Sequence, residues 1–312
     1  MNSQSTSEKL GLLKSNIKKR LVGKDDLIDR LIIALLAGGH VLLEDVPGVG
    51  KTSLAQALSD SLALSFARIQ CTPDTMPADI TGISVYNRNK EIFEPVFGPV
   101  MNNIVLADEL NRTTPKTQSA LLEVMEEKKV TIDGKDYILP KPFMVIGTQN
   151  PMETTGTYPL PEAQLDRFMM RLSVGYPDSK DAKEMAEKFL EGYLLMKTEP
   201  VLAANDIINI KKEVEDVKVN EHLVDYAVRI TEATRSDPEI ICGASPRALL
   251  SLLRCAQAYA VYEGRDYCIP EDMLNAALIT LPHRLILTAQ AKMNKSSQYK
   301  LLKNITDHIK VS

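Results

Sequence analysis

The sequence predicts an α/β protein with a doubly wound, mostly parallel sheet in a first domain and a smaller all-helical domain after it. Three observations lead to this fold class. Short apolar runs alternate with helical stretches up to about residue 177. A glycine-rich loop lies between one apolar run and a helical stretch. Residues 178–312 show long helical periods and little strand signal. Strands that alternate with helices form parallel sheets through crossover connections.

The elements of the first domain follow one another at short intervals. Periodicity predicts helices at about 8–20, 25–37, 52–63 and 117–127, and apolar strands at 40–44, 66–70, 103–107 and 143–148. Two further short runs, 130–132 and 137–139, flank Asp133-Gly134, which predicts a β-hairpin. Residues 1–7 are polar and are expected to be loose. The predicted domains are therefore 8–177, an α/β core, and 178–312, a helical lid.

Composition excludes several classes of protein. The 312 residues carry a net charge of −4, which argues against a dedicated nucleic-acid surface. The longest apolar run, 31–37, is far shorter than the ~20 residues of a membrane span. The first ten residues lack the pattern of a secretion signal. We therefore expect a cytoplasmic chain with no direct membrane insertion.

Cysteine and histidine do not predict a metal site. The four cysteines are scattered without a CxxC pair and are expected to be buried free thiols in a reducing compartment; they are Cys71, Cys242, Cys255 and Cys268. The four histidines are far apart in sequence and show no HExxH spacing. His40 is expected to pack at the start of a strand, and His283 to be structural.

The glycine-rich segment 45–52 has the strand–loop–helix context of a P-loop. Its main-chain N–H groups would point at phosphates, and its glycines would let the backbone come close. The predicted nucleotide-binding residues are Pro47, Gly48, Val49, Gly50, Lys51, Thr52 and Ser53. Lys51 would reach the β- and γ-phosphates, and the Thr52 hydroxyl would ligate Mg²⁺. One departure is Asp45, which stands where the usual motif has glycine; the alternative is a chance Gly-Lys-Thr at a helix start.

Two carboxylates follow the apolar run 104–107. Strand ends of this kind line the ligand crevice of parallel sheets. Asp108 would hold Mg²⁺, and Glu109 would act as general base on the attacking water. An acidic helix cap would explain one carboxylate but not this pair on this strand. The pair favours hydrolysis of ATP, with Mg²⁺ as the metal.

Together these segments resemble the AAA+ superfamily and, within it, the MoxR family, over about residues 8–290. The segments that carry the resemblance are Glu44-Asp45-Val46-Pro47-Gly48-Val49-Gly50-Lys51-Thr52, Arg68-Ile69-Gln70-Cys71-Thr72-Pro73-Asp74, Leu106-Ala107-Asp108-Glu109-Leu110-Asn111-Arg112, Gly147-Thr148-Gln149-Asn150-Pro151, residues 156–168, Gly243-Ala244-Ser245-Pro246-Arg247-Ala248 and Glu263-Gly264-Arg265-Asp266-Tyr267. Sequences of the MoxR type often carry Asp at the position of Asp45, so the departure from the P-loop motif fits the family.

The resemblance implies roles for three polar residues in catalysis. Asn150 matches sensor 1, although an Asn-Pro turn fits the same dipeptide. Arg167 matches the arginine finger that acts on ATP in a neighbouring subunit, although a local ion pair with Asp166 or Glu162 is the alternative. Arg247 matches sensor 2.

For Arg247, Ser245 and Pro246 predict a helix start that would let the side chain point back at the γ-phosphate; the alternative is a surface arginine. Arg112 is a second candidate for a subunit-facing arginine. Val22 and Gly23, with Lys24, match the stretch beside adenine.

The family also implies a hairpin before sensor 1 and an insertion in the second core helix, here residues 79–100. It implies a homo-oligomeric ring, most simply a hexamer, that hydrolyses ATP and remodels protein complexes, with partners that carry von Willebrand factor A domains. Two alternatives stay open from the residues. One is a nucleotide-switched binding module with little turnover, and the other is an AAA+ motor on nucleic acid, which the acidic balance disfavours.

Overall fold

The computed structural model describes residues 5–46, 48–153, 156–192 and 199–310. Its central sheet has five strands in the order β2-β5-β8-β1-β9, and all four pairings are parallel. The strands are β1 (Val41–Glu44), β2 (Phe66–Gln70), β5 (Ile104–Asp108), β8 (Met144–Gln149) and β9 (Met170–Leu172). The expected parallel α/β sheet is confirmed, and all five carboxyl ends lie along one edge.

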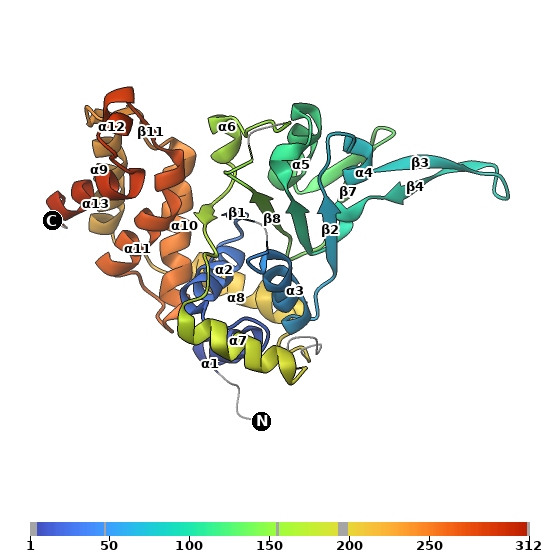
Figure 1. Cartoon of the computed structure of the whole chain (residues 1–312), viewed down its shortest axis with the longest axis horizontal. Helices are drawn as coiled ribbons and strands as arrows, with labels where there is room; N and C mark the ends of the chain where they lie inside the picture. Colours follow the sequence, from blue (N-terminus) through green and yellow to red (C-terminus); the bar gives the residue numbers. More distant parts are fainter. Residues whose placement is uncertain (1–4, 47, 154–155, 193–198, 311–312) are drawn as a thin grey trace.

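Helices cover the sheet and continue into the second half of the chain (Figure 1). The first half contains α1 (Thr6–Lys18), α2 (Asp25–Leu36), α3 (Lys51–Ser61), α4 (Pro77–Thr81), α5 (Pro115–Glu127) and α6 (Glu162–Leu165), with the 3₁₀ turns η1 (Pro99–Met101) and η2 (Leu110–Arg112). The second half contains α7 (Ser179–Leu190), α8 (Ala204–Asp216), α9 (Glu221–Ser236), α10 (Pro246–Tyr262), α11 (Pro270–Thr280), the 3₁₀ turn η4 (Pro282–Arg284), α12 (Ala289–Met293) and α13 (Gln298–His308).

The first helix begins earlier than predicted. The expected loose segment reached residue 7, but α1 starts at Thr6 because Ser5 caps it. The Ser5 hydroxyl accepts a hydrogen bond from the Glu8 N–H, and the Glu8 carboxylate accepts one from the Ser5 N–H. This reciprocal capping box satisfies two N–H groups that a helix start otherwise leaves unpaired.

The helical second half also contains a small sheet, which corrects the all-helical prediction. Strand β10 (Ile240–Cys242) follows α9, and strand β11 (Ile286–Leu287) precedes α12; the two strands pair antiparallel. Both are too short to give a periodic signal in the sequence, since they have three and two residues. Cys242 lies on β10 and is exposed, whereas Cys71, Cys255 and Cys268 are buried free thiols as expected.

Two hairpins extend the first domain. The predicted hairpin at Asp133-Gly134 forms from β6 (Lys129–Ile132) and β7 (Lys135–Ile138), and both turn residues have positive φ, as a tight two-residue turn requires. The segment 79–100 forms a longer hairpin from β3 (Gly82–Asn87) and β4 (Ile92–Phe97). Figure 1 shows this hairpin projecting from the body of the molecule.

One apolar core joins the two halves of the chain. Buried residues of α1 and α2 belong to the same cluster as those of α8 and α10, and α10 packs against α1, α2 and α8. The boundary at 177 therefore stays a prediction.

None of the helices among the described residues is long and apolar enough to cross a membrane.

His40 is buried at the amino end of β1, as predicted, and its ring is held in the neutral form. Nδ1 accepts a hydrogen bond from the Val145 N–H at 2.9 Å, and Nε2 lies 3.2 Å from the Met125 carbonyl oxygen, to which it can donate. Burial lowers the pKa of His40 to about 4, against a smaller opposing effect of the Met125 carbonyl. The charged ring would carry a second N–H at Nδ1, which would face the Val145 N–H with no acceptor between them.

The burial of His40 predicts a pH-dependent stability. Because the folded pKa is lower than the unfolded one, the unfolded chain binds the extra proton, and stability falls as pH drops from about 6.5 towards 4. Between pH 7 and pH 5 the loss attributable to His40 should be roughly 2 kcal/mol. Urea unfolding of the wild type and His40→Gln at both pH values measures it, since His283 contributes equally to both proteins. Equal pH dependence in the two proteins would contradict the assignment.

Candidate nucleotide-binding site

The P-loop connects β1 to α3 at the carboxyl edge of the sheet. Gly48 and Gly50 have φ values of 85° and 91°, a region that side chains other than glycine rarely adopt. Apart from its chain neighbours, no described residue has an atom within 4 Å of a Cβ built at either position, so conformation and not space requires glycine. Gly50 is the residue before α3, so the first N–H groups of the helix are directed into the loop. Pro47 lies outside the described residues.

Lys51 is the first residue of α3 and is 8 % exposed. Its ammonium donates to the main-chain carbonyl of Asp45 at 2.8 Å. Burial lowers the pKa of Lys51, and the negative charges of Asp108, Asp45 and Glu109 oppose that shift. The amine is therefore within the electrostatic reach of the acidic pair. Of the next two residues, Thr52 is half-buried and Ser53 is exposed.

The acidic pair lies at the end of β5, with Asp108 as its last residue. One carboxylate oxygen of Asp108 accepts from the Thr148 hydroxyl at 2.8 Å. The other accepts from Arg68 of β2, whose Nη2 is 2.5 Å and whose Nε is 3.2 Å away. Both oxygens of the predicted metal ligand are therefore occupied by protein groups. Sequence reasoning assigned no role to Arg68 or to Thr148.

Glu109 has a left-handed backbone conformation, with φ 59°. Such a conformation costs energy for a residue with a side chain and occurs at active sites as well as at turns and helix ends. Its N–H donates to the Thr148 hydroxyl at 2.8 Å. Its carboxylate lies 3.1 Å from Nε of Arg112, which also binds Glu153 through two hydrogen bonds of 2.6 and 2.7 Å. Arg112 thus neutralises Glu109 within the chain.

Asn150 follows the last residue of β8, at the same edge as Asp108. Its side-chain oxygen accepts from the Met152 N–H at 3.1 Å, and its carbonyl accepts from Asn111 at 3.5 Å. The side chain therefore forms the Asn-Pro turn that was the alternative to a sensor. Asn150 thus has the strand-end position expected of sensor 1 and also forms the turn that was the alternative. The sensor role therefore stays a prediction.

Arg167 and Arg247 lie together, and away from the P-loop. Nε of Arg167 and Nη2 of Arg247 each donate to a different oxygen of Glu126, both at 2.9 Å. The hydrogen bond from Arg167 lowers the pKa of Glu126, and the charge of Arg247 adds to that shift.

The two arginines line a cavity of about 220 Å³ with Gly38, Gly39 and His40, which precede β1. They are thus at the amino edge of the sheet, whereas the P-loop follows the carboxyl end of β1. The structure does not bring Arg247 to its own P-loop, as the sequence-based interpretation expected, because α10 starts beside α5 and α6.

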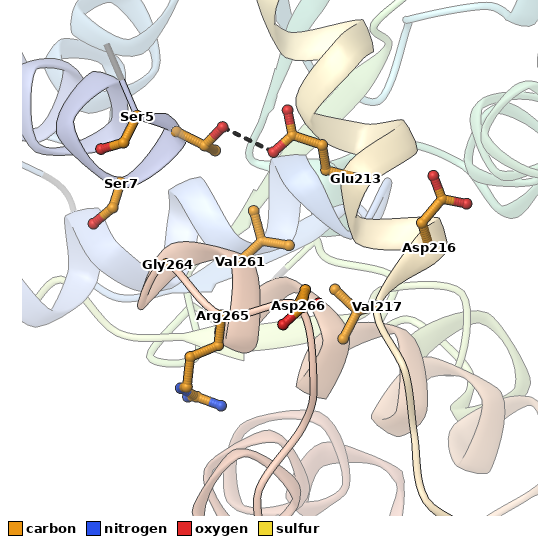
Figure 2. A pocket seen from close by; sticks show the side chains of 10 residues that line it. Ser5, Ser7, Glu213, Asp216, Val217, Val261, Gly264, Arg265 and Asp266 are labelled. Atoms are coloured by element: carbon orange, nitrogen blue, oxygen red, sulfur yellow. Dashed lines mark hydrogen bonds between the residues drawn. The ribbon is translucent and has the colours of Figure 1, made fainter. Parts of the chain in front are cut away.

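Two cavities are candidates for the rest of a ligand. One, of about 530 Å³, is lined by Gly23 and Lys24, which were predicted to lie beside adenine, and by Ser173 and Val174 after β9. Val22 is the half-buried residue before them. The other, of about 490 Å³, lies between α1, α8 and the loop after α10 (Figure 2).

The second cavity is acidic and contains no P-loop residue. Its carboxylates are Glu213, Asp216 and Asp266, and Figure 2 shows Arg265 pointing away from Glu213 and Asp216. Arg265 instead forms two hydrogen bonds of 2.7 Å with Asp272. The first cavity also contains no P-loop residue, and it is lined by Asp25, Asp26 and Asp181 beside Lys24 and Arg30. It is the candidate base site because it contains Gly23 and Lys24 and borders Ser173, which donates a hydrogen bond to Asp45 at the start of the P-loop segment.

The strand order, the P-loop and the acidic pair define a P-loop ATPase domain of the AAA+ class with a helical lid. Residues 40–170 match the family model of the ATPase family associated with various cellular activities, and residues 232–305 match the AAA lid domain.

The chain is 47 % identical over 302 residues to the uncharacterized protein YeaC of Bacillus subtilis, covering 97 % of this chain and 94 % of that protein. It is 41 % identical over 290 residues to the chaperone MoxR1 of Mycobacterium tuberculosis, covering 90 % and 76 %. A crystal structure of a candidate ATPase from Cytophaga hutchinsonii superimposes with a TM-score of 0.91 at 39 % identity, covering 98 % and 96 %. The chain belongs to the MoxR family of AAA+ ATPases.

The Thr148 hydroxyl is predicted to stabilise the acidic edge. Thr148→Val keeps the shape but leaves the buried Asp108 oxygen and the Glu109 N–H without this partner, which should cost about 1–3 kcal/mol of unfolding free energy. Thr280→Val is the matched control, because its buried hydroxyl donates only to a helical carbonyl, at 2.7 Å. Urea unfolding compares the two. A smaller loss for Thr148→Val than for Thr280→Val would contradict the prediction.

Proposed function

We propose that this chain hydrolyses ATP with Mg²⁺ in a site shared between neighbouring subunits and uses the cycle to remodel a protein complex. The observation that carries the proposal is the grouping of Lys51 with Asp108 and Glu109 at one edge of the sheet, while Arg167 and Arg247 stand at the opposite edge. A complete set of phosphate-binding and transition-state groups then requires two copies of the chain.

The residues present fit a nucleotide with Mg²⁺. Main-chain N–H groups at the start of α3 and the ammonium of Lys51 suit phosphates. The Thr52 hydroxyl and the Asp108 carboxylate are oxygen ligands of the type that Mg²⁺ prefers. The metal would supply charge neutralisation at the β- and γ-phosphates. Arg68 must give up one Asp108 oxygen, or the contact must pass through water, because both oxygens are engaged.

The role of Glu109 as general base is supported by its position. Its left-handed backbone turns the side chain out of the strand direction of β5, next to the ligand edge. Asp108 is proposed to hold the metal while Glu109 orients the attacking water. Asn150, at the neighbouring strand end, is proposed to orient the same water after its turn with Met152 opens.

Arg167 and Arg247 are proposed to act on the nucleotide of a neighbouring subunit. Glu126 keeps both guanidinium groups at one point of the surface, and its charge would be replaced by the γ-phosphate when a neighbour docks. Arg112 is less suited to this role, since Glu109 and Glu153 hold it within its own site.

The ring, its partners and its location are proposed from the family. We propose a homo-oligomeric ring, most simply a hexamer, in the cytoplasm, with protein partners that carry von Willebrand factor A domains. MoxR1 of Mycobacterium tuberculosis is named a chaperone, which supports protein remodelling as the outcome of the cycle.

Glu109→Gln should bind ATP with Mg²⁺ about as well as the wild type and should lose most hydrolysis, because the amide cannot accept the proton of the attacking water. Binding is measured by calorimetry and turnover by phosphate release. Glu153→Gln is the matched control, since Glu153 contacts the same arginine but is not the residue that follows the proposed metal ligand. Wild-type turnover in Glu109→Gln would refute the catalytic assignment.

Arg167→Ala should lower turnover on the order of 10³-fold without weakening nucleotide binding by its own chain. Mixing Arg167→Ala with Lys51→Ala subunits should restore part of the activity, because an intact P-loop then meets an intact arginine edge. Arg247→Ala should behave in the same way in the mixing assay. If Arg247→Ala cannot be rescued by Lys51→Ala subunits, the placement of Arg247 on a neighbour's nucleotide is wrong.

A further inference from the structure

The connector after β9, residues 173–176, is held from two sides. The Asp45 carboxylate accepts hydrogen bonds from the Ser173 hydroxyl at 2.8 Å and from the Gly175 N–H at 2.6 Å. On the other side, the ammonium of Lys24 donates to the carbonyls of Gly175 and Tyr176, both at 3.1 Å. The Gly175 residue is therefore fixed at its N–H by the P-loop and at its carbonyl by the start of α2.

Asp45 also holds the phosphate-binding lysine. Its main-chain carbonyl accepts the hydrogen bond from Lys51, while its carboxylate binds the connector. One residue thus joins the group that would contact phosphate to the segment that leads into α7. A glycine, which the usual motif has at this position, could accept from Lys51 but not from Ser173 or Gly175.

The connector forms a wall of the candidate base cavity. Ser173 and Val174 line it opposite Gly23 and Lys24, and Val174 is 5 % exposed, so its position is fixed by packing. The Asp181 side chain of α7 lies directly against Gly23, since a Cβ built there would lie 1.7 Å from the Asp181 carboxylate. A shift of the connector would change the shape of this cavity.

The Asp45 carboxylate is suited to remain charged in this place. Burial by itself would raise its pKa, but the hydrogen bonds from Gly175, Ser173 and Val46 outweigh that effect and leave the pKa below its usual value. Hydrogen bonds to an ionised acceptor are stronger than those between neutral groups. The contact between the P-loop and the connector therefore persists at neutral pH.

We propose that Asp45 is a positioning residue that couples phosphate binding at Lys51 to the wall of the base cavity formed by residues 173–176. This inference rests on the proposed function, because it assumes that the ligand is an adenine nucleotide. When phosphate draws the Lys51 ammonium away from the Asp45 carbonyl, the loop start can move, and the connector moves with it. Asp45 then sets how tightly the base is held.

The test compares ADP, which carries the adenine base, with pyrophosphate, which has no base. Asp45→Asn keeps the size of the side chain, but its amide N–H₂ must face either the Ser173 hydroxyl and the Gly175 N–H, which share Oδ2, or the Val46 N–H at Oδ1. It should weaken ADP binding about tenfold while changing pyrophosphate binding by less than about twofold. Ser173→Ala should shift ADP binding in the same direction by about threefold. Asp136→Asn is the matched control, because that carboxylate also accepts hydrogen bonds, here from the side chains of Lys129 and Thr131 in the β6–β7 hairpin.

Hydrogen–deuterium exchange supplies an independent measurement. In the wild type without ligand, the Gly175 amide should exchange slowly, and ADP should change its rate. In Asp45→Asn it should exchange faster without ligand, and ADP should change it less. Ser173→Ala serves in the same assay if Asp45→Asn does not fold.

Equal losses for ADP and pyrophosphate would overturn the inference, since Asp45 would then shape only the phosphate loop. Unchanged ADP affinity in both variants would also overturn it. Failure of the proposed function has a different signature. The wild type would then bind neither ligand, while the exchange of Gly175 would still report whether Asp45 holds the connector.

Discussion

The pairing of β5 between β2 and β8 is the constraint on which the candidate site depends. Because the three strands are parallel and in register, their last residues meet at one edge. That register brings Arg68, Asp108 and Thr148 within hydrogen-bond distance although they come from three separate segments. The Thr148 hydroxyl then fixes both acids, since it donates to Asp108 and accepts from the Glu109 N–H. A one-residue slip of β8 would turn this hydroxyl to the other face of the sheet.

The opposite edge is organised by contacts to the second half of the chain. Asp166 accepts from the Ser245 hydroxyl, which caps α10, and pairs with Nε of Arg284 at 3.2 Å. Arg284 also donates to the carbonyls of Asp166 and Phe168, and burial lowers its pKa to about 10. Nε2 of His283 donates a hydrogen bond to the same Phe168 carbonyl at 2.9 Å. The segment 166–168, which includes Arg167, is therefore joined to the start of α10 and to η4 by hydrogen bonds.

The sequence predicted most of the fold and the phosphate-binding part of the site. Apolar runs and helical periods are local signals, and the strand β2 was predicted with its observed bounds. The partners of the site residues could not be predicted in the same way. Arg68 and Glu126 act through contacts to residues about 40 and 121 positions away, as their bonds to Asp108 and Arg247 show. Such pairs follow from strand order and helix packing, which one sequence does not display.

Arg247 illustrates the difference most clearly. The Ser-Pro start of its helix was predicted correctly and is observed, with the Ser245 hydroxyl accepting from the Ala248 N–H. The direction in which that helix start points depends on how α10 packs against α2 and α8, and this packing places it beside Glu126. The capping pattern thus predicted where α10 starts, but not the edge of the sheet next to which that start lies.

The separation of the two edges also restricts the symmetry of any assembly that uses both. In a two-fold dimer the two copies are equivalent and each surface meets its own copy, so the faces with Arg167 and Arg247 would meet each other and neither P-loop would receive these arginines. A contact of one edge with the other edge of the next copy is heterologous and has a direction. Repeated, it either closes into a cycle or continues as a helical filament. The angle at which successive copies meet, and not the chemistry of either edge, would decide between these two outcomes.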